Sequence, residues 1–130
     1  MILDTSFVID IMRNEPKALE KAQELLERGE PLLVTAVTIF ELFSGIVRSN
    51  KPVQEKNKIL KTLQGQLIVH FDSDAAEKAG EIHGTLARTG NTLDPLDCMI
   101  AGIALTKKEK VLTKNEKHFS RVRGLEIETY

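Results

Sequence analysis

Short apolar segments alternate along this chain with longer segments of helical character. The apolar segments, each predicted to be a strand, are residues 1–4, 32–35, 66–71, 110–113 and 125–128. Helical spacing or helix-start residues occupy the intervals, at 7–12, 16–28, 36–48, 52–65, 73–89 and 94–105. Strands that alternate with helices of this length are typical of a parallel sheet with helices on both faces. We therefore expect one α/β domain over residues 1–130, a three-layer sandwich around a mostly parallel sheet.

Acidic and amide side chains stand where such a fold collects function. In open parallel sheets, ligands bind beyond the carboxyl ends of the strands, near the point where the strand order reverses. Asp4 ends the first predicted strand. Its alternative role is to cap the helix predicted to begin at Phe7, but Ser6 is the better placed cap for that helix. Asp4 is therefore a candidate site residue.

Glu41 is the second candidate, on the helix predicted for residues 36–48. It shares a narrow stripe with Thr38, Gly45 and Arg48, and the rest of the helix is apolar. The stripe could simply face water. The wide apolar surface instead predicts a helix that is buried on most sides, where a carboxylate is costly unless a positive group meets it.

Asp94, Asp97 and Asn115 complete the set of candidates. Asp94-Pro95 begins a helix, which places Asp94 at the N-cap and Asp97 in the first turn, where both could act only as caps. The small, apolar residues behind them predict close packing on the sheet, which would carry Asp97 to the rim near the strand ends. Asn115 follows the strand at 110–113, or only caps a short turn at 116–119.

Taken together, these acids indicate a metal site. Carboxylates that converge on one rim repel one another by several kcal/mol at about 4–5 Å, unless a cation lies between them. Oxygen ligands favour Mg²⁺ or Mn²⁺ over zinc. Such an ion can lower the pKa of a water and stabilise a phosphodiester transition state. No competing serine or cysteine nucleophile arrangement is present, since the single cysteine, Cys98, lies inside the apolar helix.

The charge is unevenly distributed. The formal net charge is −1, which argues against a protein that coats nucleic acid through bulk positive charge. Residues 107–123 nevertheless hold seven basic and two acidic side chains. This basic segment is either a solvated face or a rim for a polyanion. No apolar run is long enough to span a membrane, and the charged N-terminal segment does not resemble a signal peptide, so we expect a cytoplasmic protein.

Several segments together resemble the PIN-domain family, in particular the VapC-type toxins of toxin–antitoxin pairs. The matching segments are Ile2–Ser6, Thr38–Leu42, Leu96–Ala101, Val111–Phe119 and Arg121–Leu125. They span the whole chain in the order of the family. The resemblance implies a Mg²⁺-dependent endoribonuclease, for which Mn²⁺ can substitute.

The resemblance also assigns residue roles. Asp4, Glu41 and Asp97 match the first, second and third acids of the family, and Asp4 and Asp97 would contact the metal. Asn115 stands where many members have a fourth acid and others an amide, so the sequence leaves open whether one or two ions bind. Asp94 matches an extra acid found in only some members.

The resemblance further implies partners. Members cleave RNA, are commonly homodimers, and are inhibited by a small VapB-like antitoxin whose C-terminal segment crosses the active-site groove. Thr113 would support the site through its hydroxyl group. The RNA target and the geometry of the dimer are not given by the sequence.

Three other functions fit parts of this pattern. A non-catalytic binding module of the same fold would use the acids only as caps, and a housekeeping RNA-processing nuclease would keep the chemistry but not the toxin role. A receiver-like phospho-acceptor domain needs an aspartate on a mid-chain strand. No aspartate lies between Lys51 and Phe71, which argues against that domain.

Overall fold

A five-stranded sheet forms the centre of the computed structural model, which describes residues 1–130. The strands are Ile2–Leu3 (β1), Leu33–Thr35 (β2), Leu67–Val69 (β3), Val111–Leu112 (β4) and Ile127–Glu128 (β5). Their order is β3-β2-β1-β4-β5, and every neighbouring pair is parallel. The predicted parallel α/β architecture is confirmed.

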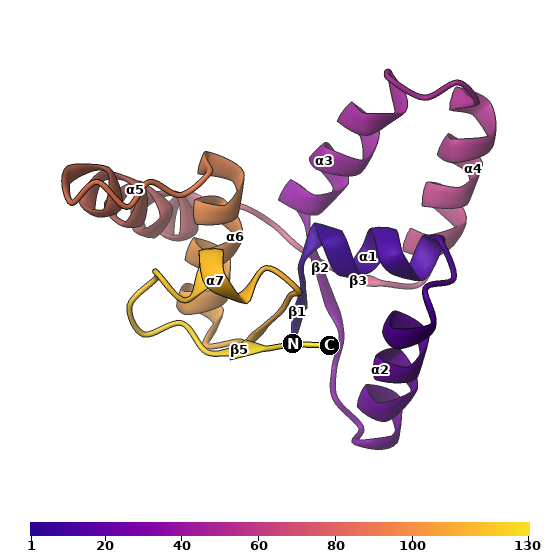
Figure 1. Cartoon of the computed structure of the whole chain (residues 1–130), viewed down its shortest axis with the longest axis horizontal. Coiled ribbons are helices and arrows are strands. Elements are labelled where there is room, and N and C mark those ends of the chain that lie inside the picture. The colour runs from indigo at the N-terminus through magenta and orange to yellow at the C-terminus, as the bar shows by residue number, and fades with distance from the viewer.

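Seven helices cover the two faces of this sheet. They are Thr5–Met12 (α1), Pro16–Glu27 (α2), Ala36–Ile46 (α3), Pro52–Leu63 (α4), Ser73–Arg88 (α5), Pro95–Lys107 (α6) and Glu116–Phe119 (α7). In Figure 1, α5, α6 and α7 lie to the left of the central strands β1 and β2, α1, α2 and α4 lie to their right, and α3 lies above β2. This arrangement gives the three layers that the sequence predicts.

Two separate hydrophobic cores fill the spaces between the layers. Ile2 and Val111 belong to the core beneath α5 and α6, whereas their chain neighbours Leu3 and Leu112 belong to the core beneath α1, α2 and α4. Successive side chains of a strand point to opposite faces of a sheet, so each two-residue strand serves both cores. All four side chains are almost fully buried, as in a parallel sheet covered on both faces.

The first helix begins earlier than predicted. It starts at Thr5, and its N-cap is Asp4, whose side chain accepts a hydrogen bond from the Thr5 N–H. The expectation of a cap at Ser6 and a start at Phe7 is therefore wrong. Because Asp4 directly follows β1 and caps the helix itself, α1 starts without an intervening loop. Ser6 lies inside the helix and donates its hydroxyl hydrogen to Asp4 Oδ2 at 2.8 Å.

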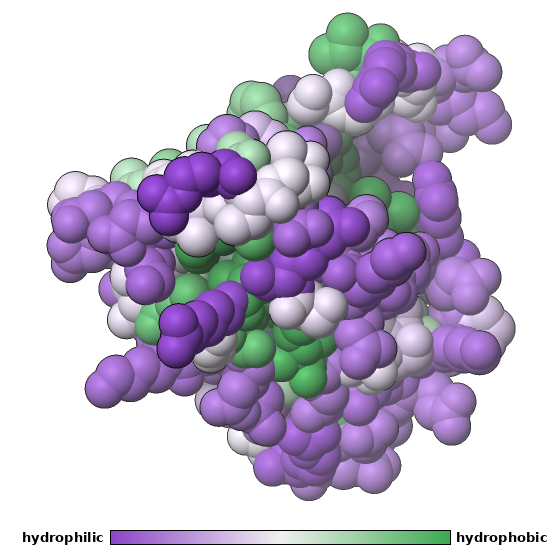
Figure 2. Space-filling view, turned by 60° about the vertical axis from the view of Figure 1, so that its left-hand side comes forward, coloured by the Kyte–Doolittle hydropathy of each residue, from purple (hydrophilic) through white to green (hydrophobic).

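Helix α3 is less buried than predicted. Phe40 is 60 % exposed, and Val47, which follows the helix, is 86 % exposed. The expectation of a helix buried on most sides is confirmed only in part, since Val37, Thr38 and Leu42 are buried. Phe40 is exposed because α3 rises away from the sheet beside α4, and the two helices form an arm (Figure 1). Apolar side chains at the top of Figure 2 mark the far end of this arm, where Val53 is also exposed.

Helices α5 and α6 pack at very short range. Gly102 of α6 lies where a Cβ atom would stand 2.7 Å from the Ala75 carbonyl oxygen and 2.9 Å from the Ala79 nitrogen of α5. Only a glycine permits this approach, which fixes the position of α6 and of Asp97 in its first turn.

No helix of the structure is both long enough and apolar enough to cross a membrane.

Candidate active site

The strand order reverses between β1 and β4, and Asp4 lies at this point. The chain builds the sheet outward from β1 through β2 to β3, and then crosses to β4 on the other side of β1. Asp4 directly follows β1, and its backbone N–H donates to the Leu112 carbonyl of β4 at 3.0 Å. This is the place where open parallel sheets bind ligands.

The Asp4 carboxylate is buried and fixed. Only 3 % of the residue is exposed. Its Oδ1 accepts from the Thr5 N–H at 2.8 Å, and its Oδ2 accepts from the hydroxyls of Ser6 and Thr113 at 2.8 and 2.7 Å. A carboxylate has about four lone-pair sites, so three donors leave one free for a ligand.

Glu41 is held beside Asp4 by threonine hydroxyls. The Thr5 hydroxyl donates to Glu41 Oε1 at 2.7 Å and lies 3.0 Å from the Thr38 hydroxyl. Thr38 in turn lies at the start of α3, where its N–H donates to Thr35 Oγ1 at 3.1 Å. Desolvation raises the pKa of Glu41, and the negative charges of Asp4 and Asp94 raise it further.

Asp97 has the most perturbed carboxyl group of the site. Desolvation, followed by the negative charges of Asp4, Asp94 and Glu41, raises its pKa from 3.8 to about 7. The side chain accepts no hydrogen bond and pairs with no cation in the structure. Negative charges gathered in this way lower the stability of the fold. A carboxyl group in such surroundings therefore indicates a functional site.

Asp94 and Asn115 lie at the rim and are exposed. Asp94 caps α6, because its Oδ1 accepts from the Leu96 N–H at 2.9 Å. Asn115 precedes α7, but its side chain makes no capping hydrogen bond. Its backbone N–H donates to Thr113 Oγ1 at 2.9 Å, so the hydroxyl that supports Asp4 also orders the start of α7.

The side chains meet the requirements of Mg²⁺ but not those of a metal that needs an all-protein cage. No three His, Cys, Asp or Glu side chains lie close enough together to hold an ion among themselves. Mg²⁺ keeps several waters and binds through one or two carboxylates. Asp4, with one free lone-pair site, and Asp97, without any partner, are suited to that role.

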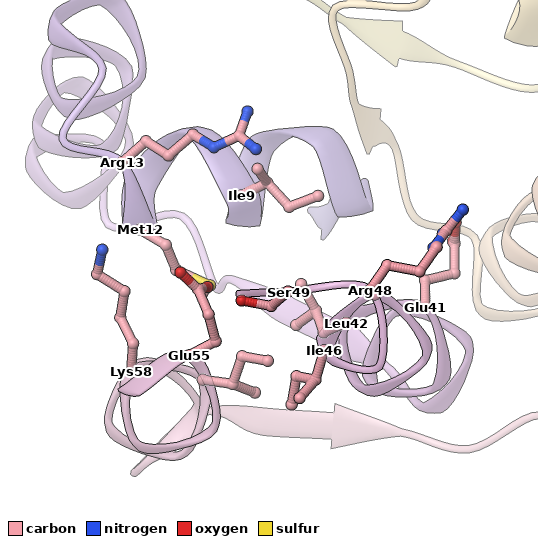
Figure 3. Close-up of a pocket in the computed structure, with 12 residues that line it drawn as sticks. Ile9, Met12, Arg13, Glu41, Leu42, Ile46, Arg48, Ser49, Glu55 and Lys58 are labelled. Atoms are coloured by element: carbon pink, nitrogen blue, oxygen red, sulfur yellow. The ribbon is translucent and has the colours of Figure 1, made fainter. Parts of the chain in front are cut away.

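A cavity of about 340 Å³ adjoins Glu41 between α1, α3 and α4 (Figure 3). Its floor is apolar and is formed by Ile9, Met12, Leu42, Ile46 and Ile59. Glu41 lies at one side of the labelled residues in Figure 3, and Arg13 and Lys58 lie at the opposite side. Arg48 lies on the same side as Glu41, and Glu55 on the same side as Lys58, so each side of the cavity holds charges of both signs.

The basic segment of residues 107–123 does not form one surface. Lys107 and Lys110 precede β4 and pair with Asp72 and Glu126 at 3.7 Å each. Lys114 follows β4 and lies at the same edge of the sheet as Asp4. The strand divides the segment, so only its later part can serve a ligand at the candidate site.

Sequence reasoning missed part of this site. The sequence assigns Ser6 only a helix cap and gives no role at the site to Thr5 or to Asp10, which is 6 % exposed and binds Lys114. The Asp-Thr-Ser sequence directly after a strand is the signal that could have revealed the hydroxyls. Asp10 has no such signal, because its partners are more than 100 residues away in the chain.

Known proteins resemble this chain over nearly its full length. Residues 1–125 match the PIN domain family. The tRNA(fMet)-specific endonuclease VapC of Shigella flexneri is 32 % identical, over 99 % of this chain and 96 % of that protein. The DNA-bound VapBC structure from Salmonella typhimurium superposes with a TM-score of 0.87 and 29 % identity, covering 98 % of this chain and 96 % of the matched chain. The Rickettsia felis VapBC2 structure, bound to a promoter DNA fragment, has the same TM-score at 24 % identity and the same coverages, and shows the shared fold.

Proposed function

Because the chain belongs to the PIN domain family, we propose that it is an endoribonuclease that hydrolyses phosphodiester bonds in RNA with Mg²⁺ as cofactor. The observation that carries the proposal is the group of carboxylates at the strand reversal. Asp4, Glu41 and Asp97 come from three different helical starts or turns and lie close enough for their charges to raise the pKa of Asp97. Clustered, perturbed acids of this kind are typical of catalytic sites.

Asp4 and Asp97 are the side chains that would hold the ion. When bound, Mg²⁺ supplies charge stabilisation to the phosphodiester transition state and makes a bound water more acidic. Asp4 is positioned before any ligand arrives, because Thr5, Ser6 and Thr113 fix its two oxygens. Such fixed geometry avoids reorganisation during the reaction.

Glu41 is the side chain we assign to the attacking water. The Thr5 hydroxyl holds one of its oxygens, and the other oxygen is left to orient the water or to take its proton. The raised pKa of Glu41 brings the carboxylate nearer the pH range in which general bases work best. Asp97 would share this task. Asn115 lies at the rim as a candidate contact for the phosphate or for a second ion.

The comparisons support a toxin–antitoxin role. A relative named tRNA(fMet)-specific endonuclease VapC and a VapBC complex both match nearly the whole chain. We infer that the chain is the toxin of such a pair, acts as a homodimer in the cytoplasm, and is inhibited by a VapB-like antitoxin. A transfer RNA is the substrate to test first.

Cleavage of initiator tRNA by the purified protein, with Mg²⁺ and with EDTA, tests the function. Wild type is expected to cut only with Mg²⁺ or Mn²⁺, and Asp97→Asn to be inactive in both while keeping the wild-type circular dichroism spectrum. Titration calorimetry with Mn²⁺ on the same two proteins separates the alternative. A wild type that neither binds Mn²⁺ nor cuts RNA would be a non-catalytic binding module of this fold.

A further inference from the structure

A second cavity, of about 400 Å³, adjoins the one beside Glu41. Its lining consists of Asp10, Arg13, Glu15, Lys17, Lys114 and Tyr130. Arg13 lines both cavities, so they lie on either side of one side chain; Figure 3 shows this arginine at the edge of the first cavity. Three of the six lining side chains are cations and two, Asp10 and Glu15, are carboxylates, so the lining carries one net positive charge in a protein whose net charge is −1.

Lys114 is fixed within this second cavity. Its Nζ donates to both oxygens of Asp10, at 3.2 and 2.9 Å, and its side chain is 50 % exposed. An ammonium group has three N–H donors, so one remains for a ligand. The residue before it, Thr113, donates to Asp4 Oδ2, which places Lys114 one residue from the candidate active site.

Asp10 is itself held by Tyr130. The Tyr130 hydroxyl donates to Asp10 Oδ2 at 2.7 Å. The ring of Tyr130 packs edge-on against Phe7, with 4.9 Å between centroids. Asp10 is 6 % exposed, so the carboxylate that orients Lys114 is buried and cannot move freely. The ammonium is therefore pre-positioned, unlike an ordinary surface lysine.

We propose that Arg13, Lys17 and Lys114 form a subsite for successive backbone phosphates of the RNA substrate beside the scissile bond, one cation to each phosphate, with Asp10 and Tyr130 as positioning residues. The subsite rests on the proposed function. Carboxylates at the active site repel a polyanion, so attraction has to come from cations beside them. These three side chains line a cavity that shares Arg13 with the cavity beside Glu41, so they can supply that attraction to neighbouring phosphates.

The salt dependence of RNA binding tests the subsite. We would measure the dissociation constant of a short fluorescein-labelled single-stranded RNA in EDTA, so that no cleavage occurs, from about 50 to 200 mM KCl. Each phosphate contact contributes about 0.7 to the slope of log Kd against log salt for single strands. Arg13→Ala and Lys17→Ala are each expected to lower the slope by about that amount.

Lys114→Ala alone would leave the buried Asp10 unpaired and risks unfolding. The double variant Asp10→Asn/Lys114→Met avoids this, because Tyr130 can still donate to the amide oxygen and the net charge of the protein does not change. It too is expected to lose about 0.7 of the slope. Lys110→Ala is the matched control, since Lys110 lies before β4 and should leave the slope unchanged.

The outcomes are distinguishable when wild-type cleavage of tRNA with Mg²⁺ is measured in parallel. Cleavage together with unchanged slopes in the three subsite variants would overturn the subsite and leave the nuclease function standing. Equal slope losses in Lys110→Ala and the subsite variants would show bulk charge alone, and would also overturn it. A wild type without cleavage and without RNA binding would overturn both proposals.

Discussion

Replacement of Gly102 by alanine is expected to destabilise the protein through the contact between α5 and α6. The added Cβ atom would lie 2.7 Å from the Ala75 carbonyl oxygen, 2.9 Å from the Ala79 nitrogen and 3.0 Å from Ala79 Cβ. Carbon atoms pack best at about 3.5–4.0 Å. Two of the three neighbours are backbone atoms of a 16-residue helix, so neither can rotate out of the way. The helices must therefore separate.

The size of the effect follows from two opposing contributions. Overpacking of a close contact costs about 1–3 kcal/mol, and occasionally more. Alanine in a helix interior is favoured over glycine by about 1 kcal/mol. Because the clash involves rigid backbone, we expect the upper part of the range and a net loss of about 2 kcal/mol. For a chain of this length that corresponds to a melting temperature lower by roughly 6–12 °C.

Urea denaturation followed by circular dichroism measures this loss, and Gly84→Ala provides the matched control. Gly84 lies inside α5, and a Cβ atom there would have no neighbour within 4 Å. That variant should be more stable than the wild type by about 0.5–1 kcal/mol. If Gly102→Ala were as stable as the wild type, or were stabilised as much as Gly84→Ala, the inferred role of the α5–α6 contact would be wrong.

Three further outcomes are expected. Asp97→Asn should stabilise the metal-free protein at about pH 8, because a pKa raised from 3.8 to about 7 means that the ionised carboxylate destabilises the fold as the pH rises through this range. The pKa shift corresponds to about 4 kcal/mol at most, and water at the rim reduces this to about 1–2 kcal/mol. Thermal melting in EDTA measures the gain in stability, and an Asp97→Asn variant less stable than the wild type would contradict the prediction. Thr113→Val should lose about 1–3 kcal/mol in urea denaturation and most RNA cleavage, because a buried donor to Asp4 is removed; full activity would show that Asp4 needs no such support. Hydrogen bonds from Arg28 and then Lys21 lower the pKa of Glu128 to about 2, so stability should fall by about 1 kcal/mol as the pH drops from about 4.5 to 2, and Glu128→Gln should lack this part of the acid transition.

The sequence was sufficient for the order of elements and for the two-sided sheet. Hydrophobic pairs such as Ile2-Leu3 and Val111-Leu112 predict strands because both faces need an apolar side chain. The exposure of Phe40 was not predictable in this way. Hydropathy indicates which residues can be buried, but whether a helix lies flat on the sheet or rises from it depends on tertiary contacts of the whole arm.

For the site, the order of elements placed Asp4 and Asp97 near the strand ends, and the polar stripe of its helix and the family resemblance added Glu41; the structure brings these three within range of one another's charges. The hydrogen bonds that position these side chains could not be predicted from the sequence. The pairing of Thr5 with Glu41 joins residues 36 positions apart, and that of Tyr130 with Asp10 joins residues 120 apart. Side-chain partners at such separations carry no periodic signal in the sequence.

The two residues of β1 limit where insertions and deletions can occur in this protein. Ile2 packs in one core and Leu3 in the other, so neither residue can change sides without loss of a core contact. A single inserted residue there would exchange the inward sides of Ile2 and Leu3 and displace Asp4 from its three donors in the same step. The turn between α3 and α4 contributes no residue to either core. We therefore expect insertions and deletions among relatives to occur mainly at this turn.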